Sequence, residues 1–274
     1  MAGETVLLND LYNTKITYMK GEIFPSFFDS VPHSHDHSEI FINISGEIDI
    51  FAETNMYHLT GGEVRLYAGG ELHCGKTDKP QYMEWYQISL DKEFFEENRT
   101  LGKVLFDRDF GTKNVFYSKK YEEMVFLLNE LFTVWRNDNE LWINYGKSTV
   151  LRILCLLNET ENNTDIDVKN SDVMKKLVDL INLDFRNIST VKDLCERTYY
   201  SPAYINRVFA SSMNVTPYRF ILGKKLNEAK NALRTGASVT EACEYAGFNS
   251  YSNFITLFHK QFGVTPKKYR DKFI

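Results

Sequence analysis

The side chains with the clearest chemical potential lie in the segment PHSHDHSEIFINISG, which contains His33, His35 and Glu39. The spacing HxHxxxE puts these three residues at alternate positions of one extended run, so they would point to the same face of a sheet. Imidazole and carboxylate groups together suit Mn, Fe, Ni, Zn or Cu. They also suit hydrogen bonds to a small polar ligand. The segment therefore predicts a metal site, a polar ligand pocket, or side chains that only pack and bond to backbone.

A second set of suitable side chains lies near the C-terminal end, on two short predicted helices that begin at Ser201 and Ser250. Serine is a favoured N-cap, and Pro202 stands at the first helical position, where its missing N–H does no harm. Helical periodicity puts apolar residues on one face of each helix. The outward faces carry groups that suit base edges and phosphates. These are Ala203, Tyr204, Asn206 and Arg207, then Tyr251, Ser252, Asn253, Thr256 and Lys260.

These two helices belong to an internal repeat. The stretch SPAYINRVF from Ser201 matches SYSNFITLF from Ser250 at an offset of 49 residues, and VTP recurs at the same offset. Upstream the offset is 48, as in the match of Cys195 with Cys243. Two copies of a helix-turn-helix module explain the pattern. A long helix from Thr216-Pro217 to about Arg234 separates them, and its length of about 27 Å could hold two recognition helices about one DNA turn apart.

The repeat resembles the DNA-binding domain of the AraC/XylS family of transcription regulators, over about a hundred C-terminal residues. The resemblance implies that the second helix of each module enters the major groove of promoter or operator DNA, and that RNA polymerase is a partner. Carried over by position, the implied base contacts are Ala203, Asn206, Arg207, Tyr251, Ser252, Asn253 and Thr256. The family often has a large polar or aromatic residue at the first of these positions and commonly Arg at the last, which favours Asn206, Arg207 and Asn253.

Alternating apolar stretches at residues 39–44, 48–51 and 83–88, separated by glycine turns, predict an antiparallel β region up to about residue 115. The stretch GEVRLYAGGELH, together with the histidine segment, resembles the paired motifs of the cupin jelly roll, with Ala68 and Thr77 replacing the usual Pro and Asn. That resemblance brings His73 opposite His33, His35 and Glu39 and makes all four possible metal ligands. Trp85 and Gln87 share one strand face and are predicted to line the same cavity.

The pattern becomes helical after residue 115, with two amphipathic helices from Tyr121 to Trp135 and from about Leu141. These helices either pack on the barrel or, as the family resemblance implies, form a homodimer contact around Leu128, Phe132, Leu151 and Leu154. A polar linker follows at 161–167, and a helix from Val173 to Phe185 leads into the first module. The predicted domains are a cupin-like sensor at 1–115, a dimerisation segment at 116–161 and the DNA-binding domain at 170–274.

Composition limits the function classes. The 274 residues carry a net charge of −5, but residues 170–274 have 16 Lys and Arg against 9 Asp and Glu, as expected for a DNA-binding part. The four cysteines form no CxxC pair, so we expect neither disulfides nor a cysteine metal site. No apolar run is long enough for a membrane span, and the start does not resemble a signal peptide, so we expect a cytoplasmic protein.

The leading hypothesis is a transcription regulator whose N-terminal barrel binds a small effector, for which the family resemblance suggests a sugar or glycoside. The rival is a metal-dependent cupin enzyme with a DNA-binding tail, and a third interpretation is a ligand-blind DNA-binding protein. Nothing in the sequence supplies a catalytic base distinct from the possible metal ligands, so we expect no enzymatic activity. No cofactor is required by this hypothesis, although a divalent metal in the barrel remains an open alternative.

Overall fold

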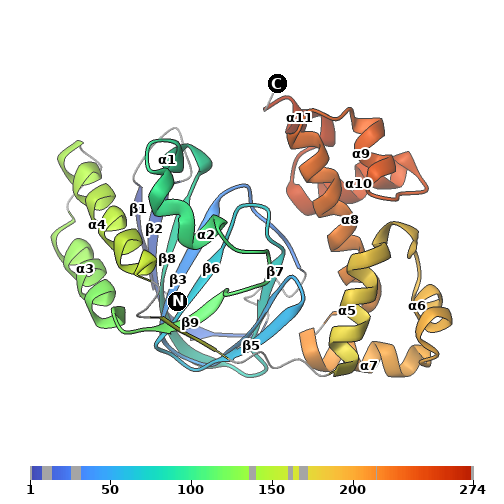
Figure 1. Ribbon diagram of the computed structural model, residues 1–274, viewed down its shortest axis with the longest axis horizontal. Helices are drawn as coiled ribbons and strands as arrows, with labels where there is room; N and C mark the ends of the chain where they lie inside the picture. Colours follow the sequence, from blue (N-terminus) through green and yellow to red (C-terminus); the bar gives the residue numbers. More distant parts are fainter. Residues whose placement is uncertain are drawn as a thin grey trace. The chain divides into compact units, whose positions relative to one another are not determined.

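The computed structural model describes residues 2–7, 14–25, 32–135, 140–159, 163–166, 172–213 and 215–272. The chain divides into two compact units, one of residues 1–29 and 34–169 and the other of residues 30–33 and 170–274. The first unit contains the strands and the second is built from helices (Figure 1). The predicted class, a β domain followed by an all-helical C-terminal domain, is confirmed.

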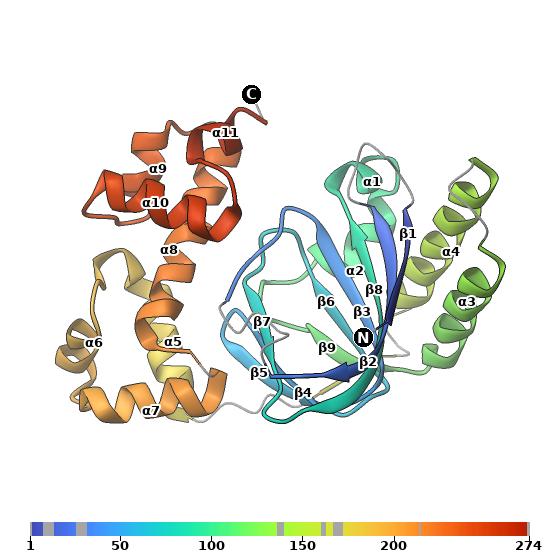
Figure 2. The same cartoon turned by 180° about the vertical axis from the view of Figure 1, so that it is seen from behind.

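The N-terminal unit consists of two antiparallel sheets. Among the described residues, the larger has seven strands in the order β1-β2-β8-β3-β6-β9-β10, and the smaller has the order β5-β4-β7 (Figure 2). The strands are β1 Ala2–Leu7, β2 Lys15–Ile23, β3 Ser38–Ser45, β4 Ile48–Ala52, β5 Asn55–Leu59, β6 Glu63–Tyr67, β7 His73–Lys76, β8 Gln81–Leu90, β9 Val115–Ser118 and β10 Asn163–Asp165. The three alternating stretches of the sequence lie in β3, β4 and β8, as predicted.

The histidine segment departs from the prediction, because β3 begins only at Ser38 and His33 and His35 lie before it. The turn at Gly69-Gly70 packs directly on this segment. The Gly70 N–H donates to the His35 carbonyl at 2.8 Å, and a Cβ on Gly69 would lie 2.6 Å from the Asp36 carbonyl oxygen. The chain bends at residues 36–37, so the expected continuous extended run is wrong.

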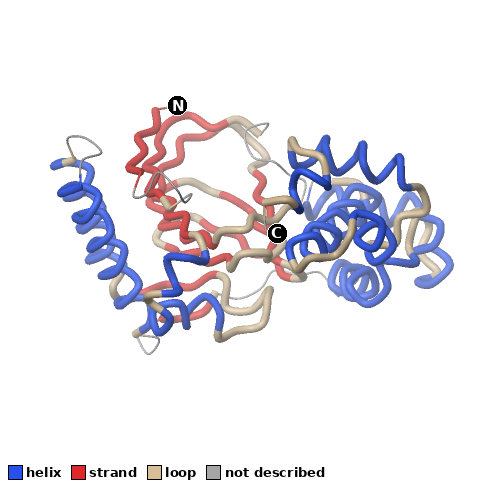
Figure 3. The backbone as a smooth tube through the Cα atoms, turned by 90° about the horizontal axis from the view of Figure 1, so that it is seen from above, coloured by secondary structure: helices blue, strands red, loops and turns tan. Residues whose placement is uncertain are grey.

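Helices α3 (Tyr121–Val134) and α4 (Glu140–Asn158) were predicted, and both pack on the large sheet (Figure 3). Their buried side chains form one core with strand residues such as Ile40 and Ile88. Leu128 and Leu154 are fully buried in this core, so the expectation that they form a contact with a second chain is wrong. Shorter helical segments precede them: α1 Lys92–Glu96, η1 Arg99–Gly102 and α2 Lys103–Phe106.

Part of the predicted linker is a strand. Residues 163–165 form β10, which pairs with β9 in the register Asn163↔Ser118 and Asp165↔Phe116. The Ile166 N–H donates to the Val115 carbonyl at 3.2 Å. The polar composition suggested a flexible connection, but backbone pairing with an edge strand does not require apolar side chains. Residues 161, 162 and 167 of the predicted linker lie outside the described residues.

The C-terminal unit contains the two predicted modules. Its helices are α5 Asp172–Asp184, η3 Phe185–Asn187, α6 Val191–Thr198, α7 Pro202–Met213, α8 Pro217–Arg234, α9 Val239–Tyr245, α10 Tyr251–Phe262 and α11 Pro266–Arg270. Helices α6 and α9 start with equivalent capping boxes, Thr190 with Asp193 and Ser238 with Glu241. Each box satisfies otherwise unpaired N–H groups at the helix start. Across both units, the described helices include none long and apolar enough to span a membrane.

Candidate functional site

Glu39, near the start of β3, is the centre of a polar cluster inside the N-terminal unit. Its Oε1 atom accepts a hydrogen bond from Gln87 Nε2 at 2.7 Å and lies 3.3 Å from His37 Nε2. His35 Nε2 lies 3.9 Å from the same oxygen, and His73 Nε2 lies 3.2 Å from Oε2. One carboxylate therefore has polar neighbours from β8, from β7 and from the segment before β3.

The cluster favours an ionised Glu39. Burial by itself would raise the pKa of this carboxyl group, but hydrogen bonds from His37 and His73, together with the nearby His73 and His35 charges, outweigh burial and hold the pKa well below its usual value. A carboxylate that stays ionised while buried requires donors or cations around it. The imidazoles and the Gln87 amide supply them.

His73 links the Glu39 carboxylate to the backbone. Its Nδ1 atom lies 2.9 Å from the Glu71 carbonyl oxygen, and its Nε2 atom faces the Glu39 carboxylate. Each ring nitrogen therefore lies beside an oxygen that can accept a hydrogen bond. The ring also stacks on Tyr67, with centroids 4.1 Å apart, which fixes its plane.

The structure brings together part of the predicted set. His35, Glu39, His73 and Gln87 converge, whereas Trp85 is buried in the apolar core formed with β4 and β5 residues. His33 joins the imidazoles, because one ligand atom each from His33, His35 and His73 lies within 4.8 Å of the others. His37, which the sequence pattern did not include in the site, also contacts Glu39. Only the bend at 36–37 brings it there, and no spacing rule in the sequence would have identified it.

The donor set fits a divalent transition metal. One ligand atom each from His35, His37 and Glu39 lies within 4.8 Å of the others, and imidazole with carboxylate is a common combination for Zn and its neighbours. His73 could add a third imidazole beside the other carboxylate oxygen. The same groups also fit the hydroxyls of a small ligand. The described cavities, which lie beside α2 and β10, beside α1, and near Lys225, have other residues in their walls.

In the C-terminal unit, all seven predicted base-contacting side chains are exposed. On α7, Ile205 and Phe209 are buried in the core, and Ala203, Asn206 and Arg207 are exposed. The Arg207 guanidinium lies 5.3 Å from the centroid of the Tyr204 ring, a cation–π contact that orients it. The Asn206 amide donates to the Pro202 carbonyl at 2.9 Å, so its oxygen remains available as an acceptor.

Helix α10 presents an equivalent face. Its core residues are Phe254 and Phe258, and Tyr251, Ser252, Asn253 and Thr256 are exposed. The Ser250 side chain caps the helix by accepting from the Asn253 N–H at 3.3 Å. The Thr256 hydroxyl donates to the Ser252 carbonyl of its own helix, which occupies its only proton. Thr256 can therefore only accept a hydrogen bond from a base edge.

Comparisons with known proteins agree with both parts. Residues 28–109 match the family described as AraC-like ligand binding domain, and residues 194–272 match a helix-turn-helix domain. The HTH-type transcriptional activator RhaR of Mannheimia succiniciproducens is 23% identical over 248 residues, which cover 88% of this chain and 87% of that protein. The HTH-type transcriptional regulator YdeO of Shigella flexneri is 25% identical over 74% of this chain and 81% of its own length.

Among solved structures, ToxT from Vibrio cholerae matches 93% of this chain and 98% of its own, with 15% identity and a TM-score of 0.38. The two family matches and the repeated helix-turn-helix geometry define a DNA-binding transcription regulator with an N-terminal ligand-binding domain. The chain belongs to the AraC/XylS family of transcription regulators.

Proposed function

We propose that this regulator controls transcription in response to a small effector bound in the N-terminal unit, and that the effector is a sugar or glycoside. One observation carries the proposal: a buried carboxylate, Glu39, is surrounded by polar groups in a domain matched to a ligand-binding family. Hydroxyl groups donate and accept, so a sugar could bond to Glu39, to the imidazoles and to Gln87. The ligand must favour one DNA-binding arrangement through a difference in affinity.

DNA contact is assigned to the exposed faces of α7 and α10. Arg207, Asn206 and Asn253 are the residues proposed to read bases, because their polar side chains are exposed and lie away from the core. Tyr251, Ser252, Ala203 and Thr256 would complete the two faces. RNA polymerase is the further partner that this function requires, and activation is the mode named for the relative RhaR.

A homodimer is proposed to form through the outer faces of α3 and α4. Phe126 and Leu141 are 64% and 70% exposed, so both helices offer a large apolar side chain to a second chain. They replace Leu128 and Leu154 as the proposed contact residues. A Phe126→Glu variant would remain folded and become monomeric in sedimentation, and an unchanged assembly state would remove this face from the interface.

A divalent cation is the second candidate for the effector, since His35, His37 and Glu39 offer a set of ligand atoms and both nitrogens of His73 face oxygens. The bound ion would supply positive charge at Glu39 and fix the imidazole planes.

The experiment that tests the proposal measures binding of the full chain to promoter DNA by fluorescence anisotropy, with and without sugars, and again with Zn²⁺. A sugar-dependent change in affinity that disappears in His73→Ala supports the sugar. A change that only Zn²⁺ produces supports the cation. If neither ligand changes DNA affinity, the regulator is ligand-blind and the effector proposal fails, while DNA binding stands.

A further inference from the structure

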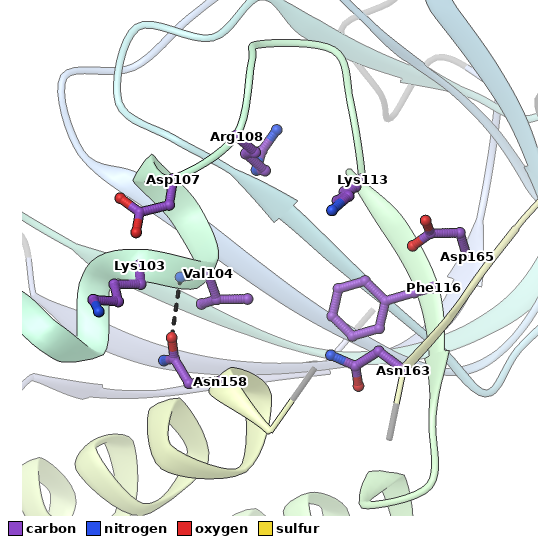
Figure 4. Close-up of a pocket in the computed structure, with 9 residues that line it drawn as sticks. All are labelled: Lys103, Val104, Asp107, Arg108, Lys113, Phe116, Asn158, Asn163 and Asp165. Carbon is purple, nitrogen blue, oxygen red and sulfur yellow. Dashed lines mark hydrogen bonds between the residues drawn. The ribbon is translucent and has the colours of Figure 1, made fainter. Parts of the chain in front are cut away.

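A cavity of about 410 Å³ lies on the N-terminal unit away from the Glu39 cluster, within the range of small-molecule sites. Three parts of the chain form it. Lys103, Val104 and Asp107 come from α2 and the residue after it, Lys113 lies just before β9 and Phe116 within it, and Asn163 and Asp165 come from β10 (Figure 4). The end of α4 closes the remaining side with Asn158, whose Oδ1 accepts from the Val104 N–H at 3.2 Å.

The rim of this cavity carries balanced charge. Lys103, Lys113, Asp107 and Asp165 are exposed, and the ion pairs described for the structure include none of them. Two ammonium and two carboxylate groups thus stand around the opening without favouring either sign of ligand. Because exposed charges of this kind interact only weakly with one another across water, they remain free to hydrogen-bond to a ligand.

The inner wall is also neutral in net charge. Arg108 is almost fully buried and forms a bidentate pair with Glu71, at 2.6 Å and 3.0 Å. The charge of Arg108 is therefore already compensated, and an anionic ligand would compete with Glu71 for the guanidinium. Phe116, also buried, and Val104 add apolar surface beside these polar groups.

Two polar atoms of the wall have no hydrogen-bond partner among the described residues: Arg108 Nε, a donor, and Asn163 Oδ1, an acceptor. Both atoms are buried, so they lie behind the surface that a bound molecule would contact. The groups that can reach such a molecule are the ammonium and carboxylate groups of the rim. A hydroxyl group both donates and accepts, and it therefore suits a rim that offers donors and acceptors.

We propose that this cavity is a binding site for a neutral, hydroxyl-rich molecule of the size of a sugar or polyol, separate from the Glu39 cluster. The ligand bonds to the carboxylates and ammonium groups of the rim and lays its carbon skeleton against Phe116 and Val104. Neither the family comparisons nor the sequence pattern identifies this cavity as a binding site. The site goes beyond the proposed effector function, because it holds whether or not Glu39 binds a ligand.

Occupation of the cavity has a structural consequence for β10. This strand is only three residues long, and two of them, Asn163 and Asp165, line the cavity. A ligand that contacts both α2 and β10 ties the strand more firmly to β9. Beyond β10, the next described element along the chain is α5, the first helix of the C-terminal unit. The cavity is therefore placed where a ligand stabilises the last strand before the DNA-binding unit.

The test uses the full chain with D-glucose, D-galactose, D-xylose and myo-inositol at millimolar concentration, and with serine as a small zwitterionic comparison. Thermal shift and calorimetry measure binding, and hydrogen exchange measures protection of residues 163–166. Asp165→Ala and Lys113→Ala should weaken binding by about tenfold or more, the factor expected for a lost hydrogen bond to a charged group. Asp109→Ala and Lys119→Ala are matched controls, since both side chains are exposed and lie outside the cavity wall.

Selective binding of a polyol, lost in the two cavity variants, kept in the controls and in His73→Ala, and accompanied by protection of β10, is the expected result. Three outcomes overturn the proposal: no binding of any polyol, binding of serine alone, or polyol binding that only His73→Ala removes. In the last case the Glu39 cluster is the sugar site and the proposed function survives. Polyol binding in the cavity without any change in DNA affinity supports the inference and separates it from the effector function.

Discussion

Tyr199 and Gly247 occupy the same turn position in the two helix-turn-helix modules, and both have left-handed backbone, with φ of 60° and 72°. They are 48 residues apart, which is also the offset between the first helices of the two modules. Gly247 packs against the backbone of Arg186, and a Cβ there would lie 2.4 Å from its carbonyl oxygen. Tyr199 is 95% exposed, so the first module has room for a side chain where the second has none.

Replacing Tyr199 with glycine is expected to stabilise the C-terminal unit. A non-glycine residue in the left-handed region costs about 1–2 kcal/mol, and the greater chain entropy of glycine offsets part of that gain. The net increase in the free energy of unfolding should be at most about 1 kcal/mol, measured by urea denaturation. A less stable Tyr199→Gly variant would show that the exposed ring contributes packing that outweighs the backbone strain.

Gly247→Ala should destabilise the protein by about 2 kcal/mol or more, because the left-handed backbone and the overlap with Arg186 act together. Gly236→Ala is the matched control: its φ is 98°, but no atom lies within 4 Å of the added Cβ. That variant pays for backbone strain alone, about 1–2 kcal/mol. Equal losses in the two variants, measured in the same denaturant series, would mean that the turn at Gly247 shifts easily away from Arg186.

Arg207→Ala is expected to weaken specific DNA binding by about 1–3 kcal/mol, the range for one base-reading side chain. The fold should persist, since Arg207 is exposed and only its Tyr204 contact is lost. Anisotropy titration against promoter DNA measures the change, with Arg99→Ala as an exposed arginine control in the other unit. Equal affinity of the Arg207 variant and the wild type would remove this residue from the interface.

Glu71→Gln should cost about 3–5 kcal/mol of stability, because it leaves the buried Arg108 charge without its partner. The carboxylate also accepts from the Gly111 N–H at 2.7 Å and from the Ala68 N–H at 2.9 Å. Glu123→Gln provides the comparison: its pair with Arg152 lies at the surface and should contribute little. Similar unfolding midpoints for both variants would contradict the importance assigned to burial.

Asp193, in the capping box of α6, predicts an acid-dependent loss of stability. Hydrogen bonds from the backbone N–H groups of Ser189 and Thr190 lower its pKa below the ordinary value. Its contribution is therefore present above the unfolded pKa, about 3.9, and is lost as pH falls toward the lower folded pKa. Asp193→Ala should cost about 1 kcal/mol near neutral pH. The difference from wild type, followed by denaturation across pH, should shrink below about pH 4; a constant difference would contradict the ionised cap.

Much of the C-terminal unit could be predicted from the sequence, because its signals are local. Caps such as Ser201 and Ser250, prolines at helix starts and apolar residues at helical spacing all act within one turn. The internal repeat shows each of these patterns twice, once in each module. The exposure of Arg207 and Asn253 followed from the same periodicity and is seen in the structure.

The polar cluster could be predicted only in part, since it depends on contacts between distant segments. Alternation was expected to place Glu39 with His33 and His35 on one strand, but β3 begins only at Ser38, and the Gly69-Gly70 turn packs on the segment before it. The bend at residues 36–37 brings His37 to the carboxylate. The strand at 163–165 was missed for a similar reason. Its residues pair with β9 through the backbone, and such pairing does not depend on the polarity of the side chains.

Lys225, near the middle of α8, donates to the carbonyls of Gly247 and Arg186, at 2.7 Å and 3.3 Å. These carbonyls belong to segments on either side of the long helix, one before the first module and one in the turn of the second. The Lys225 ammonium group thus links the segment before the first module to the turn of the second module. The two modules should consequently unfold together, in one cooperative thermal transition of the C-terminal unit.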